Sequence, residues 1–264
     1  MTAAALDGRV AVVTGVSRRA GIGFAVARRL LDDGFRVLVH GWPGHDEQRP
    51  WGADAGGIDA IVDALGGAGP RLVAVEADLG EADAPRQVID RAVAAFGAVD
   101  ALVANHARSS DVGLDAVTAQ ELDRTWAVNA RAVVLLVQAY AARRDDARSP
   151  GRVVLFTSGQ HLAPMADELP YAISKGAVHQ MTRTLADALA DRGVTVNAIN
   201  PGPVDTGWPS PELRARLAPA FPAGRWGRPE DIAAVVAWLL SADSAWVTGQ
   251  VIDAEGGFRR HLGR

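Results

Sequence analysis

Seven short runs of apolar, mostly β-branched residues recur along the chain, separated by longer stretches in which apolar positions have helical spacing. Within each run the apolar residues are continuous, which indicates strands that are buried on both faces. A parallel sheet covered by helices on both sides has such strands, so the pattern predicts a doubly wound α/β fold. The predicted strands are 9–14, 36–40, 71–76, 100–105, 152–157, 194–199 and 250–254.

Capping residues, glycine and proline mark where the helices begin and end. Thr118 and Glu121 form a capping-box pattern at the start of a long helix. Pro170 and Pro229 occupy positions typical of a first helical turn, and a glycine follows two of the helices. The predicted helices are 22–33, 81–96, 118–143, one that begins at 170 and one that begins at 229.

Two stretches have no regular pattern. Residues 41–57 contain Pro43, Pro50 and many polar side chains, so a surface excursion beside the second strand is expected. Residues 202–227 hold five prolines and two tryptophans, which is typical of an irregular flap with one short helix at 212–217. No linker divides the chain, and we expect one domain over residues 1–264 with 202–227 as its substrate flap.

Composition excludes several kinds of partner and site. The formal net charge is −4 and the arginines are interspersed with acids, so nucleic acid is not an expected partner. The absence of cysteine excludes disulfides and thiolate metal sites, and the cytoplasm is the expected location. Residues 1–9 do not resemble a signal peptide, and no run reaches the ~18 apolar residues of a membrane span. The six histidines include no pair at metal-ligand spacing with a carboxylate, so no metal is expected.

Tyr171 and Lys175 are four residues apart, which places a phenol and an ammonium group on one face of a helix. A phenol has a pKa of about 10, and a nearby cation favours the phenolate, so proton exchange with a carbonyl or alcohol oxygen near neutral pH is expected. Such pairs also occur on ordinary solvated helix faces. Ser158, which follows the run 152–157, and a glycine-rich turn after the first strand favour the catalytic interpretation.

The glycine-rich turn extends from Thr14 to Gly23 and leads directly into the first helix. Gly15, Gly21 and Gly23 allow a tight turn, and the free N–H groups at the helix N-terminus suit a pyrophosphate. A glycine-rich connection without a ligand is the alternative. The position after the first strand favours a dinucleotide site of the Rossmann type.

Together these motifs resemble the short-chain dehydrogenase/reductase family, and within it the 3-oxoacyl-[acyl-carrier-protein] reductase-like group. The resemblance covers nearly the whole chain. It rests on Tyr171 with Lys175, Thr14-Gly15 with Gly21-Ile22-Gly23, Asp78-Leu79, Asn105, Asn129, Ser158, Pro201-Gly202 with Thr206, and the C-terminal motifs that begin at Gly227 and Val247.

The resemblance implies an oxidoreductase that transfers a hydride between a nicotinamide cofactor and a carbonyl or alcohol substrate, such as a 3-oxoacyl thioester or a small ketone. Tyr171 acts as general acid or base, and Lys175 stabilises its phenolate and binds the nicotinamide ribose. Ser158 donates a hydrogen bond to the substrate oxygen, and Asn129 holds a water in a proton relay.

The resemblance also implies a set of cofactor contacts. Asp78 contacts the adenine, Asn105 and Ala107 lie near the adenine ribose, and Val204 and Thr206 hold the carboxamide. The full expected set is Gly15, Ser17, Arg18, Arg19, Gly21, Ile22, Gly23, His40, Asp78, Leu79, Asn105, Ala107, Tyr171, Lys175, Pro201, Gly202, Val204 and Thr206.

Three departures from the family pattern bear on specificity. The turn between Gly15 and Gly21 is two residues longer than usual, and Arg108 replaces a glycine, either at the edge of the cleft or as a solvated loop residue. No acid ends the second strand to bind a ribose 2′-hydroxyl, and Asp46 is the nearest one after it. Arg18 and Arg19 suit a 2′-phosphate, so NADP(H) is favoured and NAD(H) is the alternative.

Several interpretations remain open at this level. Gln160, His161 and Trp208 either line the substrate pocket or pack within loops, and Trp126, Trp238 and Trp246 belong to the core or to an interface. A homotetramer, or a dimer, is implied by pairing through the helices of Asn129 and Tyr171 and through 247–258. A catalytically silent cofactor sensor or scaffold is the alternative function. Enoyl reduction is disfavoured, because related enoyl reductases space the tyrosine and lysine more widely.

Overall fold

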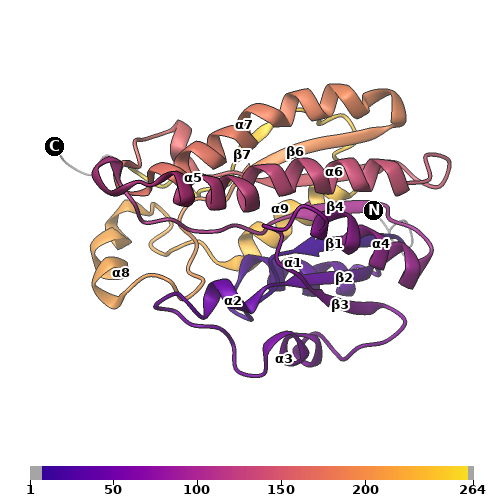
Figure 1. Ribbon diagram of the computed structural model, residues 1–264, viewed down its shortest axis with the longest axis horizontal. Helices are drawn as coiled ribbons and strands as arrows, with labels where there is room; N and C mark the ends of the chain where they lie inside the picture. Colours follow the sequence, from indigo (N-terminus) through magenta and orange to yellow (C-terminus); the bar gives the residue numbers. More distant parts are fainter. Residues whose placement is uncertain (1–7, 261–264) are drawn as a thin grey trace.

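Residues 8–260 are described by a computed structural model, in which one parallel sheet of seven strands forms the centre of the molecule. The strand order is β3-β2-β1-β4-β5-β6-β7 (Figure 1). The strands are β1 (Val10–Thr14), β2 (Arg36–Gly41), β3 (Leu72–Glu76), β4 (Ala101–Ala104), β5 (Gly151–Phe156), β6 (Val194–Asn200) and β7 (Val251–Asp253). The predicted doubly wound α/β fold is therefore confirmed. Residues 1–7, most of the segment that was judged not to resemble a signal peptide, lie outside the described range. The last of the six histidines, His261, lies outside it too.

Helices cover both faces of this sheet. The main ones are α1 (Ile22–Asp32), α2 (Pro43–Asp46), α3 (Gly57–Ala64), α4 (Ala84–Phe96), α5 (Ala119–Trp126), α6 (Ala132–Arg143), α7 (Leu169–Leu189), α8 (Pro211–Leu217) and α9 (Pro229–Leu240). Short 3-10 turns lie at η2 (Leu114–Ala116), η4 (Gly159–His161), η5 (Ala166–Glu168), η6 (Ala190–Arg192) and η7 (Ala218–Ala220), and a π-helical segment at η3 (Ala127–Arg131).

The core consists of two apolar layers, one on each face of the sheet. Val12 faces the layer of α4, α6 and α7, whereas its neighbour Val13 faces the layer of α1, α3 and α9. Val12 also lies opposite Leu38 of β2 and Leu102 of β4, which belong to the same layer as Val12. Because successive side chains point to opposite faces and both faces are covered, the strands carry apolar residues without interruption.

Several predicted boundaries differ from the structure for local reasons. The helix predicted at 81–96 begins at Ala84, because Glu81 to Asp83 form a turn in front of Pro85. The long helix predicted at 118–143 is interrupted by η3. Thr118 caps α5, accepting from the Glu121 N–H at 3.2 Å, but the Glu121 carboxylate binds Arg108 instead of returning to the cap. The excursion at 41–57 contains α2, and the following helix α3 was not predicted.

Three tryptophans expected in the core or at an interface are on the surface of the chain. Trp126, Trp238 and Trp246 are 48%, 41% and 100% exposed, so the core interpretation is wrong for all three.

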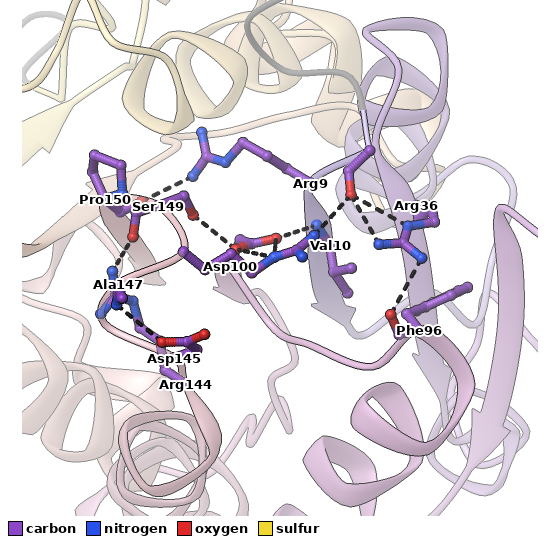
Figure 2. A network of polar contacts seen from close by, with 12 residues as sticks. Arg9, Val10, Arg36, Phe96, Asp100, Arg144, Asp145, Ala147, Ser149 and Pro150 are labelled. Carbon is purple, nitrogen blue, oxygen red and sulfur yellow. Dashed lines mark hydrogen bonds and ion pairs between the residues drawn. The ribbon is translucent and has the colours of Figure 1, made fainter.

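A polar network closes the amino-terminal edge of the sheet, opposite the edge where the strands end (Figure 2). The buried Asp100 carboxylate accepts hydrogen bonds from Val10 N at 2.8 Å, Ser149 Oγ at 2.7 Å and Arg148 Nε at 3.2 Å. Tyr140 adds a bond from its hydroxyl to the Asp100 carbonyl oxygen at 3.0 Å. The network joins β1, β4 and the loop before β5.

Replacing Asp100 by alanine is expected to lower the free energy of unfolding by about 3 kcal/mol, because the three donors that its buried carboxylate accepts lose their acceptor. Urea denaturation at constant protein concentration measures the loss. Asp145→Ala, in the exposed part of the same loop, is the control and should cost less than about 1 kcal/mol. Equal effects of the two substitutions would contradict a stabilising role for the buried carboxylate.

Candidate active site

The glycine-rich turn after β1 is built by close contacts that only glycine permits. Gly15 has φ +74°, and a Cβ atom there would lie 2.7 Å from the His106 Cα. A Cβ atom on Gly23 would overlap the Gly15 carbonyl oxygen. These contacts bring β1, α1 and the loop after β4 together. No side chain caps α1 at its N-cap residue, Gly21, so its first N–H groups are available to an anion.

A cleft of about 650 Å³ opens beside this turn, at the carboxyl ends of the strands. It lies where β1 separates β2 and β3 from β4 and the later strands, which is the switch point at which doubly wound folds bind ligands. Of the predicted cofactor residues, those that line it are Gly15, Ser17, Arg18, Gly21, Ile22, His40, Asp78, Leu79, Asn105, Ala107 and Thr206. The glycine turn, the uncapped helix and the size of the cleft fit a nicotinamide dinucleotide.

The remaining predicted cofactor residues do not line this cleft. Arg19 is exposed and binds Asp54 through its backbone N at 2.7 Å and its Nε at 2.9 Å. Gly23 is buried behind Gly15, and Val204 is buried in the core layer of α1. Gly202 follows Pro201 at φ +61° and packs on Glu255.

Arg18, in contrast, crosses the mouth of the cleft. Its Nη2 donates to the Thr206 carbonyl oxygen in the flap at 2.7 Å, and its guanidinium carbon lies 5.7 Å from the Trp51 ring centroid. The longer glycine-rich turn therefore reaches both the excursion at 41–57 and the flap.

The excursion contributes residues that, apart from Asp46, the sequence did not identify as functional. Trp42, Gly44, His45, Asp46 and Gln48 line the cleft. The Asp46 carboxylate accepts from Trp51 Nε1 at 2.9 Å, and burial raises the pKa of Asp46 above its usual value. Arg49 pairs with Asp111 at 2.9 Å and so joins the excursion to the loop after β4. The signal in the sequence was two tryptophans among charged residues, which pattern analysis assigned to a surface loop.

Two histidines form the floor of the cleft. His106 binds Thr14 Oγ1 through Nδ1 at 2.7 Å and the Val128 carbonyl oxygen through Nε2 at 3.0 Å. His40 binds the Ala77 carbonyl oxygen through Nε2 at 2.9 Å. Burial lowers the pKa of His106 to about 3 and that of His40 to about 4, so both rings are neutral. His106 was not predicted as a site residue.

Tyr171, Lys175 and Ser158 meet where α7 crosses the end of β5. Lys175 Nζ is buried, donates to the Phe156 carbonyl oxygen at 2.8 Å and lies 5.7 Å from the Tyr171 ring centroid. Burial raises the pKa of Tyr171 to about 12, although a hydrogen bond with Ser158 acts to lower it. Burial also lowers the pKa of Lys175 to about 8. The phenol is thus protonated in this structure, and the expected lowering of its pKa by the lysine is not found, because Nζ is directed to Phe156.

Asn129 lies at the centre of η3 and is fully buried. Its Oδ1 accepts from Arg108 N at 2.6 Å, while its Nδ2 donates to the Arg108 carbonyl oxygen at 2.9 Å and to Ser174 Oγ at 3.0 Å. Asn129 therefore ties the loop after β4 to the residue that precedes Lys175.

Arg108 lies at the edge of the cleft, as one of its two interpretations predicted. Its guanidinium binds both Glu121 carboxylate oxygens and donates to Thr125 Oγ1 at 2.9 Å, and the Arg108 side chain is 22% exposed. The solvated-loop interpretation is therefore wrong, because the cation is paired on α5.

The three residues considered for a substrate pocket all bind neighbouring loops. Gln160 Nε2 donates to Thr157 Oγ1 at 3.1 Å, His161 Nε2 lies 3.2 Å from Asp253 Oδ1, and Trp208 Nε1 donates to the Val204 carbonyl oxygen at 2.9 Å. Within residues 8–260 no cluster of side chains suits a metal ion. In the same range, no helix combines the length and the apolar character that crossing a membrane requires.

Comparison with known proteins agrees with this geometry. Residues 15–259 match the family model described as Enoyl-(Acyl carrier protein) reductase. The chain is 37% identical to the uncharacterized oxidoreductase YjdA of Bacillus subtilis, with 96% of this chain and 97% of that protein covered. It is 33% identical to 3beta-hydroxysteroid dehydrogenase 1 of Eggerthella lenta, with 98% and 96% covered.

A solved structure is similar to this one in fold. The short-chain dehydrogenase/reductase from Serratia marcescens has a TM-score of 0.84 and 34% sequence identity, over 96% of this chain and 98% of that one. The fold, the cleft and these relatives agree, and the chain belongs to the short-chain dehydrogenase/reductase family of NAD(P)-dependent oxidoreductases, which act on CH–OH and C=O groups.

Proposed function

We propose that the protein reduces a small carbonyl compound, or oxidises the corresponding alcohol, with Tyr171, Lys175 and Ser158 as its catalytic residues and NADP(H) as its cofactor. The observation that carries the proposal is the grouping of three side chains: Lys175 Nζ lies 5.7 Å from the Tyr171 ring centroid, and Ser158 lies beside the Tyr171 hydroxyl. A 3-oxoacyl thioester and a small ketone are the substrates that the resemblance favours.

The roles follow from the chemistry of each group. Bound NADPH supplies the hydride. Ser158 donates a hydrogen bond to the substrate oxygen, where negative charge grows. Tyr171 gives that oxygen a proton, which a phenol with a pKa of about 12 can do because an alkoxide is far more basic. Lys175 holds a positive charge next to the phenolate that remains, and its pKa of about 8 allows it to pass a proton onward.

Asn129 serves this site as a positioning residue. Its three hydrogen bonds fix the loop after β4 against α7, one residue before Lys175. The predicted water relay at Asn129 and the predicted cytoplasmic location remain part of the proposal.

NADP(H) is the proposed cofactor because the Arg18 guanidinium lines the cleft, where it contacts Thr206 of the flap and Trp51 of the excursion. Arg18 lies at the mouth of the cleft. Asp46, the first acid after the second strand, accepts a hydrogen bond from Trp51, and burial raises the pKa of its carboxyl group. A guanidinium at this position favours a 2′-phosphate, whereas a free carboxylate would repel it.

A catalytically silent cofactor sensor is the second candidate. It requires the cleft but not a proton donor such as the proposed group of Tyr171, Lys175 and Ser158. The enoyl-reductase reaction, despite the description of the matching family model, is disfavoured by the four-residue spacing of Tyr171 and Lys175.

Replacing Tyr171 by phenylalanine is expected to lower kcat/KM about 100-fold or more with little change in NADPH affinity, because it removes one proton donor and little volume. Steady-state assays of cofactor absorbance on a panel of ketones and 3-oxoacyl thioesters measure the first quantity, and fluorescence titration the second. The chain has only one other tyrosine, so Tyr140→Phe is the matched control and should keep kcat. Full activity of the Tyr171 variant would refute the assignment, and NADPH binding without any turnover by the wild type would favour the sensor.

Replacing Arg18 by alanine is expected to reduce the ratio of NADPH to NADH affinity about tenfold, since one charged hydrogen bond to the 2′-phosphate is lost. Arg19→Ala is the control, because that side chain binds Asp54 outside the cleft and should leave the ratio unchanged. Calorimetric titration of both cofactors gives the ratios. A wild-type ratio near one, or identical ratios in the two variants, argues for NAD(H).

A homotetramer is expected in solution, because apolar side chains are exposed on the helices and the C-terminal region through which the family pairs. Ile173 on α7 and Val134 on α6 are 49% and 42% exposed, and Trp246 is 100% exposed. Light scattering at micromolar concentration should give four times the chain mass. Ile173→Asp should reduce it to a dimer, because a charge is placed in the helix interface. A monomeric wild type would show that these faces do not pair.

A further inference from the structure

The segment that follows β7, residues 254–260, forms a strap against the end of the flap. Arg259 N donates to the Ala220 carbonyl oxygen at 2.9 Å, and the rings of Phe258 and Phe221 contact each other at a tilt of 41°, with centroids 4.9 Å apart. A Cβ atom on Gly257 would lie 3.4 Å from Pro222. These contacts fix the strap at the carboxyl edge of the sheet, on the same side as Ser158.

An ion pair inside the strap is anchored to the turn after β6. Arg260 binds both carboxylate oxygens of Glu255, and the two side chains are only 16% and 8% exposed. Glu255 Oε1 also accepts from Asn200 Nδ2 at 2.8 Å, and Asn200 Oδ1 accepts from Gly202 N at 3.1 Å. The guanidinium is therefore held in one orientation by a carboxylate that is itself bound to the expected nicotinamide turn.

Two glycines leave room for this pair. Gly159 directly follows Ser158, and a Cβ atom there would overlap Arg260 Nη2. A Cβ atom on Gly202 would lie 2.8 Å from the Cβ and Cγ atoms of Glu255. Arg260 thus packs on the backbone of Gly159, next to Ser158, and Glu255 packs on the backbone of Gly202.

The guanidinium has donors beyond those that Glu255 uses. An arginine carries five N–H groups, and a bidentate carboxylate takes two of them. The other nearby acid, Asp253, is bound to His161 and Asn200 and does not contact Arg260. A rigid guanidinium of this kind recognises carboxylates in preference to neutral groups.

We propose that Arg260 is a specificity residue that selects carbonyl substrates bearing a carboxylate close to the reacting carbonyl, that is, oxo acids. The inference rests on the proposed function, because Ser158 positions the carbonyl whose neighbouring carboxylate Arg260 binds. Glu255 orients the guanidinium, and the strap supplies the wall of the substrate site.

The test compares oxo acids with their methyl esters, which differ in charge and hardly in shape. Calorimetry measures binding of acetoacetate and methyl acetoacetate, and of 2-oxobutanoate and its methyl ester, to the enzyme saturated with NADP⁺. The wild type should bind at least one acid about tenfold or more tightly than its ester, as expected for hydrogen bonds to a charged group. Equal affinity within both pairs, or no binding of either acid, would overturn the proposal.

Two variants locate the effect. Arg260→Gln keeps a hydrogen-bond donor for Glu255 and should abolish the preference for the acid. Gly159→Ala should do the same, because its Cβ displaces the flexible end of Arg260. Arg259, the adjacent arginine, is exposed, so Arg259→Ala is the control and should retain the preference for the acid over its ester. A preference that survives in both Arg260→Gln and Gly159→Ala would show that another group recognises the carboxylate.

Failure of this proposal is distinguishable from failure of the proposed function. If the enzyme reduces the esters as well as the acids, and Tyr171→Phe abolishes this activity, the proposed function is supported and the role of Arg260 is refuted. If the protein binds the acids through Arg260 but transfers no hydride, the carboxylate subsite is supported and the proposed function is refuted.

Discussion

Every functional feature of this molecule depends on one constraint, the burial of a parallel sheet on both faces. Parallel strands need a crossover between each pair, so all the strands end at the same edge. The strand ends Thr14, Gly41, Ala104, Phe156, Asn200 and Asp253 are brought to that edge from positions far apart in the sequence. The glycine turn, the histidine floor, Ser158 and the strap are continuations of these strands. The opposite edge carries the Asp100 network and no predicted site residue.

The sequence predicted most of the regular structure because the information for it is local. Continuous apolar runs indicated the seven strands within one or two residues, and Pro229 with Asp231 marked the start of α9, where Asp231 accepts from Arg228 N at 2.7 Å. The way in which the excursion at 41–57 and the flap border the cleft was not predicted, because it depends on contacts between residues far apart in the sequence. Arg49 binds Asp111 and Arg18 binds Thr206, and neither pairing leaves a periodic signal.

Two arginines near the site, Arg108 and Arg260, are stabilised in the same way. Arg108 and Arg260 each place a cation near the cleft or the catalytic turn, and each is bound by a glutamate on its own side of the site. Burial of an isolated guanidinium is costly, so each pairing makes its position tolerable and also fixes its direction. The same reasoning explains why residue type alone did not reveal the role of either arginine, since the partner glutamate is 13 positions away in one case and 5 in the other.

The floor of the cleft contains a histidine, His106, that makes the stability of the fold depend on pH. The unfolded chain binds a proton on a histidine with a pKa near 6.5, whereas folded His106 has a pKa of about 3. Between these values the unfolded state holds more protons, so the contribution of His106 to stability is complete above about pH 6.5 and declines as the pH falls. Protonation would turn its acceptor nitrogen into a second donor at a site that joins β1 to η3. Lowering the pH from about 6.5 therefore lowers the stability of the fold through a residue that supports the cofactor cleft.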